Sequence, residues 1–74
     1  MNLGKYLSKM TKPELEKIIE NANFTDDEKI VFLMLSKNNS IVQISKKINV
    51  CTRTVNRKIA AIKEKIKRLE GLNW

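Results

Sequence analysis

The chain has no histidine and a single cysteine, Cys51. One cysteine excludes an internal disulfide, and a lone thiol without histidine argues against a zinc site. Histidine is also the commonest general base in enzymes. Two glycines and one proline leave no glycine-rich loop that could hold phosphate groups. We therefore expect a protein that is not an enzyme and that uses no metal and no cofactor.

Long apolar stretches are missing as well. No run approaches the roughly 20 residues that a membrane span requires, and the stretch MNLGKYLSKMTK lacks the apolar region of a secretory signal. The sequence therefore predicts a cytoplasmic protein that does not enter the membrane. With 74 residues the chain forms one small domain, residues 1–74, whose core is modest because such chains bury only about 60% of their unfolded surface.

Positive charge is present in excess, and its distribution is uneven. The formal net charge is +7. Residues 1–44 hold six lysines and six acids, whereas residues 45–74 hold six lysines, three arginines and two acids. A basic patch confined to one part of a small domain is typical of a protein that binds a polyanion. A charge excess that only aids solubility would give the same composition, so charge alone leaves both interpretations open.

The hydrophobic pattern is helical throughout. No segment alternates apolar and polar residues for the length of a strand, and no Asn-Gly or Asp-Gly hairpin pair occurs. Thr11, Thr25 and Ser40 are each followed three residues later by Glu or Gln, which is the capping-box pattern of a helix start. These signals predict an all-α fold, a small helical bundle. The expected helices cover residues 12–22, 26–37, 41–48 and 52–70, with a short helix at 2–9.

The last of these helices carries an apolar seam at alternating spacings of three and four residues, the spacing of a heptad pattern. Its members after Val55 are Ile59, Ile62, Ile66, Leu69 and Leu72. Gly71 is a suitable residue to end the helix. The seam fits two arrangements equally well. It is either part of the core beneath the helix at 12–22 or the interface of a dimer.

Residues 41–70 meet the requirements of a helix-turn-helix. Two helices that cross steeply need a small residue at the crossing, and Ser45 supplies one. The turn needs a residue that tolerates a positive φ, and Asn49 does so. Apolar residues must also hold both helices against the rest of the domain. The residues spaced for this are Ile44, Ile48, Val50, Val55 and Ile59.

A longer pattern includes this unit. It comprises the run FTDDE at 24–28, then Val31, Phe32, Met34 and Leu35, then Ser40, Ile44, Ser45, Ile48, Val50 and the Thr54-Val55 pair. In this pattern the chain resembles the LuxR-type helix-turn-helix and region 4 of bacterial sigma factors, over about residues 24–66. The resemblance implies a single helix-turn-helix domain with its core at 24–70 and a helical extension at 1–23.

The chain departs from these families at several positions. Cys51 stands where they place a Ser or Thr cap, and we expect it to be a partly buried cap residue, not a redox switch. Gln43 and Ser45 replace the usual Glu and Ala. The additional helix lies at the N-terminus, whereas LuxR-type domains continue with a helix after the recognition helix. Ile30 and Leu33 are apolar where those families are polar, so we expect the first long helix to cover them.

The resemblance implies that the helix beginning near Thr52 enters the major groove of DNA. The residue types agree, since Arg suits guanine and Asn suits adenine. Two of the three arginines of the chain lie here, although lysine would supply charge alone. We expect base contacts from Thr52, Arg53, Asn56, Arg57 and Ala60. We expect phosphate contacts from Ser40, Lys46, Lys47, Thr54, Lys58 and Lys63. On the alternative interpretation, Asn56 and residues 63–68 are only a solvated helix face.

The leading hypothesis is sequence-specific binding of double-stranded DNA by a small transcription regulator. A composition rich in Lys, Ile and Asn indicates an AT-rich bacterial or phage genome. We expect a homodimer, because helix-turn-helix proteins commonly bind two half-sites. The alternative is a protein-interaction module that engages RNA polymerase or another regulator. A third interpretation, a membrane-surface helix at 52–70, fits less well because Glu64 and the compact seam suit protein packing better.

Overall fold

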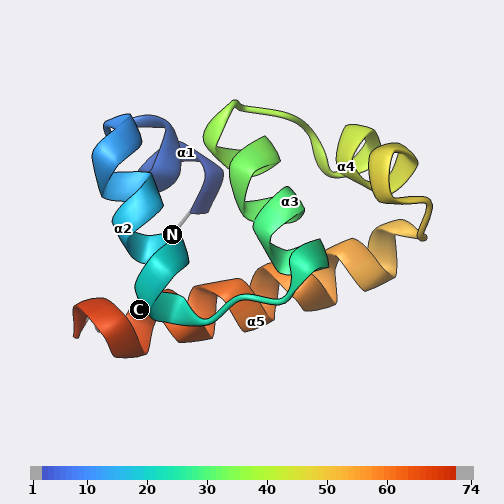
Figure 1. Ribbon diagram of the computed structural model, residues 1–74. Coiled ribbons are helices and arrows are strands. Elements are labelled where there is room, and N and C mark those ends of the chain that lie inside the picture. The colour runs from blue at the N-terminus through green and yellow to red at the C-terminus, as the bar shows by residue number, and fades with distance from the viewer. Residues whose placement is uncertain (1–2, 72–74) are drawn as a thin grey trace.

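The computed structural model describes residues 3–71 and contains five α-helices within them (Figure 1). The helices are α1 (Leu3–Ser8), α2 (Lys12–Ala22), α3 (Asp26–Ser36), α4 (Ile41–Ile48) and α5 (Thr52–Glu70). The all-helical prediction is confirmed, and the described range contains no strand. The expected bounds are close: α3 ends at Ser36, one residue earlier than expected, and α1 ends at Ser8 in place of residue 9, while the expected start at residue 2 lies outside the described residues. None of these helices combines the length and the apolar character needed to cross a bilayer.

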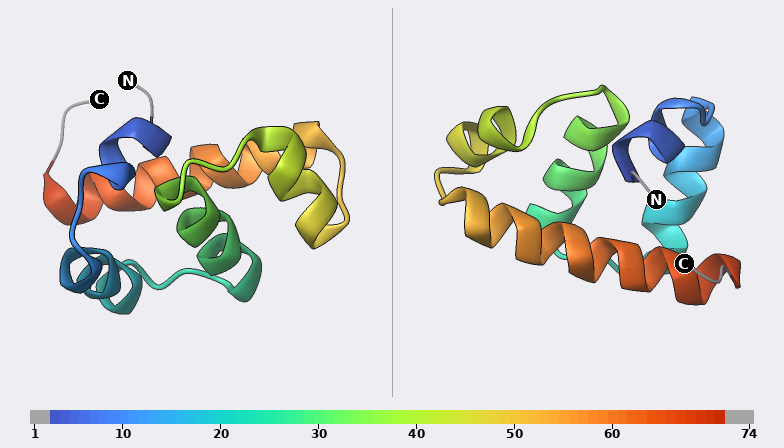
Figure 2. Two further views of the ribbon diagram at one scale, coloured as in Figure 1. Left: turned by 90° about the horizontal axis from the view of Figure 1, so that it is seen from above. Right: turned by 180° about the vertical axis from the view of Figure 1, so that it is seen from behind.

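The longest helix, α5, runs along one side of the molecule, and the other helices lie above it in Figure 1. α4 packs near its N-terminal end and α2 near its C-terminal end, while α3 packs between them. α1 packs mainly on α3. Seen from above in Figure 2, α2 and α3 lie on the same side of α5. One helix therefore supports both ends of the molecule.

A single hydrophobic core receives side chains from all five helices. Phe24 joins it from the link between α2 and α3, with its ring centroid 5.2 Å from that of Phe32. Burial of each large apolar side chain contributes roughly 1.5–3 kcal/mol, so this cluster is the main source of stability. The largest fully buried side chains are Leu7, Val31, Phe32, Ile44, Val55, Ile62 and Ile66.

The apolar seam of the last helix belongs to this core. Ile62 and Ile66 are fully buried within the chain, and the half-buried Ile59 packs against the same cluster. Leu69 is exposed, and Leu72 lies outside the described residues. Ile62 and Ile66 could reach a second copy only if the fold opened. Of the two arrangements that the sequence allowed, the intramolecular one is therefore present.

Two of the three predicted capping boxes are confirmed. The hydroxyl of Thr25 accepts from the amide of Glu28, whose carboxylate accepts from the amide of Thr25 at 2.9 Å. Ser40 and Gln43 form the same reciprocal pair at the start of α4. The prediction for Thr11 is wrong, because its hydroxyl is 3.2 Å from a carboxylate oxygen of Glu14 and caps no amide. A charged acceptor makes the stronger hydrogen bond for an exposed hydroxyl.

Helix ends depend on residues in the left-handed conformation. Gly71 ends α5 with φ of 67°, as predicted. Asn23, Asn38 and Asn49 have φ of 57°, 64° and 57°. Asn adopts this region more readily than most residues because its short polar side chain can bond locally. Asparagine therefore takes the place that glycine commonly occupies at the ends of helices.

The expectation that α2 covers Ile30 and Leu33 is wrong. These side chains remain 38% and 41% exposed. α2 packs against α5 instead and sends Ile18 into the core. Leu15 and Ile19 of α2 are half-buried against the core, and they border an open groove whose other wall includes Leu33. A helix that is apolar almost all round has exposed apolar residues unless its neighbours cover it on several sides. α3 is not covered in this way, so it keeps an apolar outer face.

Candidate nucleic-acid interface

Backbone geometry fixes the link between α4 and α5, residues 49–51. Asn49 has the predicted positive φ, and its amide donates to the carbonyl of Ser45. The amide of Val50 donates to the same carbonyl at 3.0 Å, and the Val50 side chain packs against the core. The turn therefore sets the direction in which α5 leaves α4.

α4 turns a small residue and a large one toward the interior. Ile44 is fully buried, and Ser45 is buried beside it. The hydroxyl of Ser45 donates to the carbonyl of Val42 at 2.7 Å, so its burial leaves no polar atom without a partner. α4 and α5 are in direct contact. Ser45 is therefore buried on a helix that packs against its successor, and its place at a steep crossing of α4 and α5 stays a prediction.

The first three turns of α5 have one buried face and one exposed edge. Val55 is fully buried and Ile59 is half-buried, so the orientation of the helix about its axis is fixed. The residues predicted to contact bases all lie on the exposed side, which we call the outer edge of α5. Its members are Thr52, Arg53, Asn56, Arg57 and Ala60.

Neither arginine of the outer edge has an acidic partner within residues 3–71. Among residues 3–71 the ion pairs involve Lys58, Lys65 and Arg68, and neither Arg53 nor Arg57 takes part. An exposed guanidinium without a carboxylate can present its planar set of donors to another acceptor. The outer edge can therefore offer two such groups one helical turn apart.

The residues predicted to contact phosphate do not form one group. Lys46 and Lys47 are exposed at the end of α4. Ser40 is exposed at the start of α4, where its hydroxyl accepts from Gln43 at 3.2 Å. The other three, Thr54, Lys58 and Lys63, are half-buried on α5.

Cys51 is the N-cap residue of α5, and it is exposed, not partly buried as expected. Its side chain caps no backbone amide in the way that Thr25 and Ser40 do. The sulfur lies 3.3 Å from the hydroxyl oxygen of Thr54. The Thr54 hydroxyl and the backbone amides at the helix start lower the pKa of the thiol. α5 therefore begins without a side-chain cap, whereas α3 and α4 each have one.

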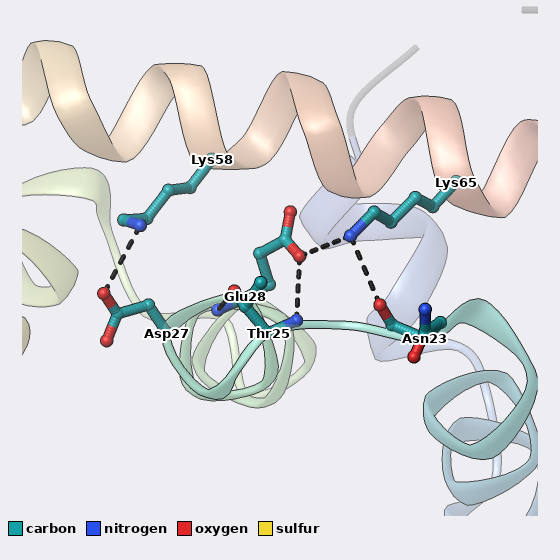
Figure 3. Close-up of polar contacts among 6 residues, drawn as sticks. All are labelled: Asn23, Thr25, Asp27, Glu28, Lys58 and Lys65. Carbon is teal, nitrogen blue, oxygen red and sulfur yellow. Dashed lines mark hydrogen bonds and ion pairs between the residues drawn. The ribbon is translucent and has the colours of Figure 1, made fainter.

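A partly buried ion pair ties α5 to the start of α3 (Figure 3). Lys65 donates to Glu28 at 2.6 Å and to the carbonyl of Asn23 at 3.3 Å. Its ammonium also lies 5.8 Å from the ring centroid of Phe24. Burial raises the pKa of Glu28, but hydrogen bonds from Lys65 and from the Thr25 amide outweigh this and hold the pKa below its usual value. Sequence reasoning gave Glu28 only a capping role and left Lys65 among the solvated lysines.

A second and looser ion pair lies nearer the outer edge. The ammonium of Lys58 is 3.4 Å from a carboxylate oxygen of Asp27, also on the first turn of α3 (Figure 3). One of the predicted phosphate contacts therefore already has a carboxylate beside it. No feature of the sequence indicated this pairing, because the two residues lie far apart along the chain.

A groove runs along the other flank of α5. Asn56 and Ile59 line it on the side of α5, and Asn38 and Ser40 line it from the link between α3 and α4. The start of α1, including Lys5, closes it. Asn56 is therefore not an isolated polar residue on a bare helix. The sequence gave no signal that α1 would lie beside a predicted base contact.

Within residues 3–71 no group of acidic or cysteine side chains could hold a metal ion. Comparison of the chain with protein-family models, with curated proteins and with solved structures finds no match.

Proposed function

We propose that the chain binds double-stranded DNA in a sequence-specific way, with α4 and α5 as a helix-turn-helix. The observation that carries the proposal is the outer edge of α5. Its five residues are all exposed, while Val55 is fully buried on the opposite face. Recognition helices of this kind contact base edges with residues near their N-terminus. α5 presents its two unpaired arginines in that part.

The side chains on the outer edge match the donor and acceptor pattern of the major groove. Arg53 and Arg57 can each donate two hydrogen bonds to guanine O6 and N7, and Asn56 can pair with adenine N6 and N7. Ala60 offers a small apolar surface to a thymine methyl group. Lysine would attract phosphate equally well, so the two arginines favour base reading over charge alone.

Phosphate contacts would orient the helix in the groove. Lys46 and Lys47 lie at the end of α4, directly before the turn, and Ser40 lies at its start. Contacts of this kind fix register without carrying sequence information. The net charge of residues 45–74 accounts for the whole +7 of the chain, which supports binding to a polyanion at this end.

The biological role that we propose is that of a small bacterial or phage transcription regulator acting in the cytoplasm. The similarity to LuxR-type domains and sigma region 4 supports this role. A homodimer on two half-sites is part of the proposal, with an interface outside the buried Ile62 and Ile66. Sedimentation at high micromolar concentration tests it, and a monomer under those conditions would remove the dimer from the proposal.

The test of DNA binding is a titration of a labelled duplex across a salt series. Neutralised phosphates release counterions, so the logarithm of the binding constant should fall linearly with the logarithm of salt concentration. A binding constant that does not fall with salt concentration, or no binding at low salt, would disprove the proposal. Selection of a preferred site from random DNA then separates sequence-specific binding from charge attraction.

A second candidate function is protein interaction, for example with RNA polymerase or another regulator. One observation favours it: Ile30 and Leu33 form an exposed apolar face beside the groove bordered by Leu15 and Ile19. Exposed apolar patches often mark interaction sites. Co-purification with polymerase that is lost in Leu33→Lys but kept in Val42→Lys would support it. Equal behaviour of the two variants would count against it.

A further inference from the structure

Two ion pairs join the first turn of α3 to α5, and they differ in strength and exposure. The Glu28–Lys65 pair is 2.6 Å long, with side chains 8% and 33% exposed. The Asp27–Lys58 pair is 3.4 Å long, with side chains 57% and 24% exposed. A separation of 3.4 Å exceeds the usual N–H···O hydrogen-bond range of about 2.7–3.2 Å. The first pair is a structural clamp, and the second is weak and open to solvent.

Of the two lysines in these pairs, only Lys58 lies among the residues proposed to touch DNA. Thr54, Arg57 and Lys58 line one shallow groove together with Thr25 and Glu28 at the start of α3. Arg57 belongs to the outer edge, and Lys58 is a proposed phosphate contact. Asp27 lies 3.4 Å from the Lys58 ammonium, so it places a negative charge beside a proposed phosphate contact.

We propose that Asp27 opposes DNA binding by holding Lys58, and that a DNA phosphate replaces its carboxylate when α5 docks. The inference rests on the proposed DNA binding. The exchange needs only a small movement of a flexible lysine, because an exposed ion pair has little net stability. Lys65 cannot make the same exchange, since it also bonds the Asn23 carbonyl and lies over Phe24.

The exchange lowers affinity in two ways. Lys58 must give up one anion to gain another, so its contact with phosphate adds less than that of a free lysine. Asp27 then remains near the phosphate as a like charge, which is unfavourable. Asp27 therefore lowers the affinity for DNA, and it does not stabilise the fold in the way that Glu28 does.

The experiment compares Asp27→Asn with Asp26→Asn. Both acids lie in the first turn of α3, so each substitution removes one charge and the same helix-dipole interaction. Asp26 is exposed and forms no ion pair with residues 3–71. Affinity is measured by fluorescence anisotropy on a labelled mixed-sequence duplex of about 20 base pairs, enough for two half-sites. Circular dichroism confirms that each variant is folded.

Asp27→Asn should bind about two- to fivefold more tightly than the original chain, with a steeper dependence on salt. Asp26→Asn should change affinity less than about twofold, because a screened charge farther from the duplex acts weakly. In a Lys58→Met background the advantage of Asp27→Asn over Asp26→Asn should become smaller, because only the repulsion between Asp27 and the phosphate remains. Equal effects of the two substitutions in the original chain, or an advantage that Lys58→Met leaves undiminished, would overturn the inference while leaving DNA binding intact. A failure of the original chain to bind the duplex in a salt-dependent way would overturn the proposed function, and this inference with it.

Discussion

The ammonium of Lys65 lies 2.6 Å from the carboxylate of Glu28, and 37 positions separate the two residues in the sequence. This contact fastens the C-terminal half of α5 to the start of α3. Glu28 serves a second purpose there, because the same carboxylate oxygen accepts the amide of Thr25 at 2.9 Å. One side chain thus caps a helix and holds a neighbouring helix in place.

Glu28→Gln separates these two purposes. Glutamine keeps the capping box, as Gln43 does at the start of α4, but it loses the charged partner of Lys65. We expect a loss of about 1–3 kcal/mol in the free energy of unfolding at pH 7, the contribution of a hydrogen bond to a charged group. Urea unfolding followed by circular dichroism measures it.

The pH dependence gives an internal control for this variant. The pKa of Glu28 is lower in the folded state than its usual value. Its contribution is therefore complete above the unfolded-state pKa, about 4.3, and is lost as pH falls through the lower folded-state value. The difference between Glu28→Gln and the original chain should shrink in acid. A difference that stays constant from pH 7 to pH 2 would contradict the role of the carboxylate.

Ile62→Val tests whether the seam is internal. Removing one methylene from a fully buried isoleucine should cost about 0.5–1.5 kcal/mol of folding stability. The loss should not depend on protein concentration, because Ile62 contacts its own chain. Thermal unfolding over a hundredfold range of concentration checks this, with Leu69→Ala as the exposed control on the same helix. A loss that changes with concentration would indicate an interface between copies at Ile62.

Cys51→Ser should stabilise the chain. Serine can accept from the amide three residues on, as Thr25 and Ser40 do, and α5 has no such cap. We expect the melting temperature to rise by about 3–6 °C for a domain of this size. Cys51→Ala provides the comparison, since it removes the sulfur without adding a cap. If serine and alanine melt together, the missing cap is not a source of instability.

Arg57→Ala and Lys46→Ala should weaken DNA binding in different ways. Loss of a base-reading arginine should cost about 1–3 kcal/mol on the preferred site and relax its specificity. Loss of a phosphate contact should weaken all sequences alike and reduce the salt slope by about one unit. Titrations on the selected site and on a scrambled duplex distinguish the two. Equal losses on both duplexes for Arg57→Ala would show that it acts only as a charge.

Local chemistry accounts for the parts of the fold that the sequence predicted well. Thr25 and Ser40 cap their helices because each partner lies only three residues away, and Asn49 takes a positive φ at the turn because asparagine tolerates the left-handed region. The exposed edge of α5 followed from Val55 and Ile59, because two inward residues one turn apart fix the orientation of a rigid helix about its axis.

Contacts between distant segments account for what was missed. The sequence gives lysines on α5 and acids at the start of α3, but it does not say that Lys58 meets Asp27 or that Lys65 meets Glu28. It also left open where α2 would pack. The expectation that α2 covers Leu33 failed because apolar spacing shows that a helix has a buried face, not which neighbour that face meets. Thr11 failed for a different reason, since the carboxylate of Glu14 competes for its hydroxyl.

The continuity of α5 limits how the chain could adapt to different partners. Val55 near its N-terminal end and Ile66 three turns later are both fully buried on one unbroken helix. Rotating α5 about its axis to re-orient the outer edge would also remove Ile66 from its packing at the far end of the helix. The orientation of Arg53 and Arg57 is thus anchored by side chains that never approach them. Any adjustment to a new surface must come from tilting the whole molecule or from the reach of individual side chains.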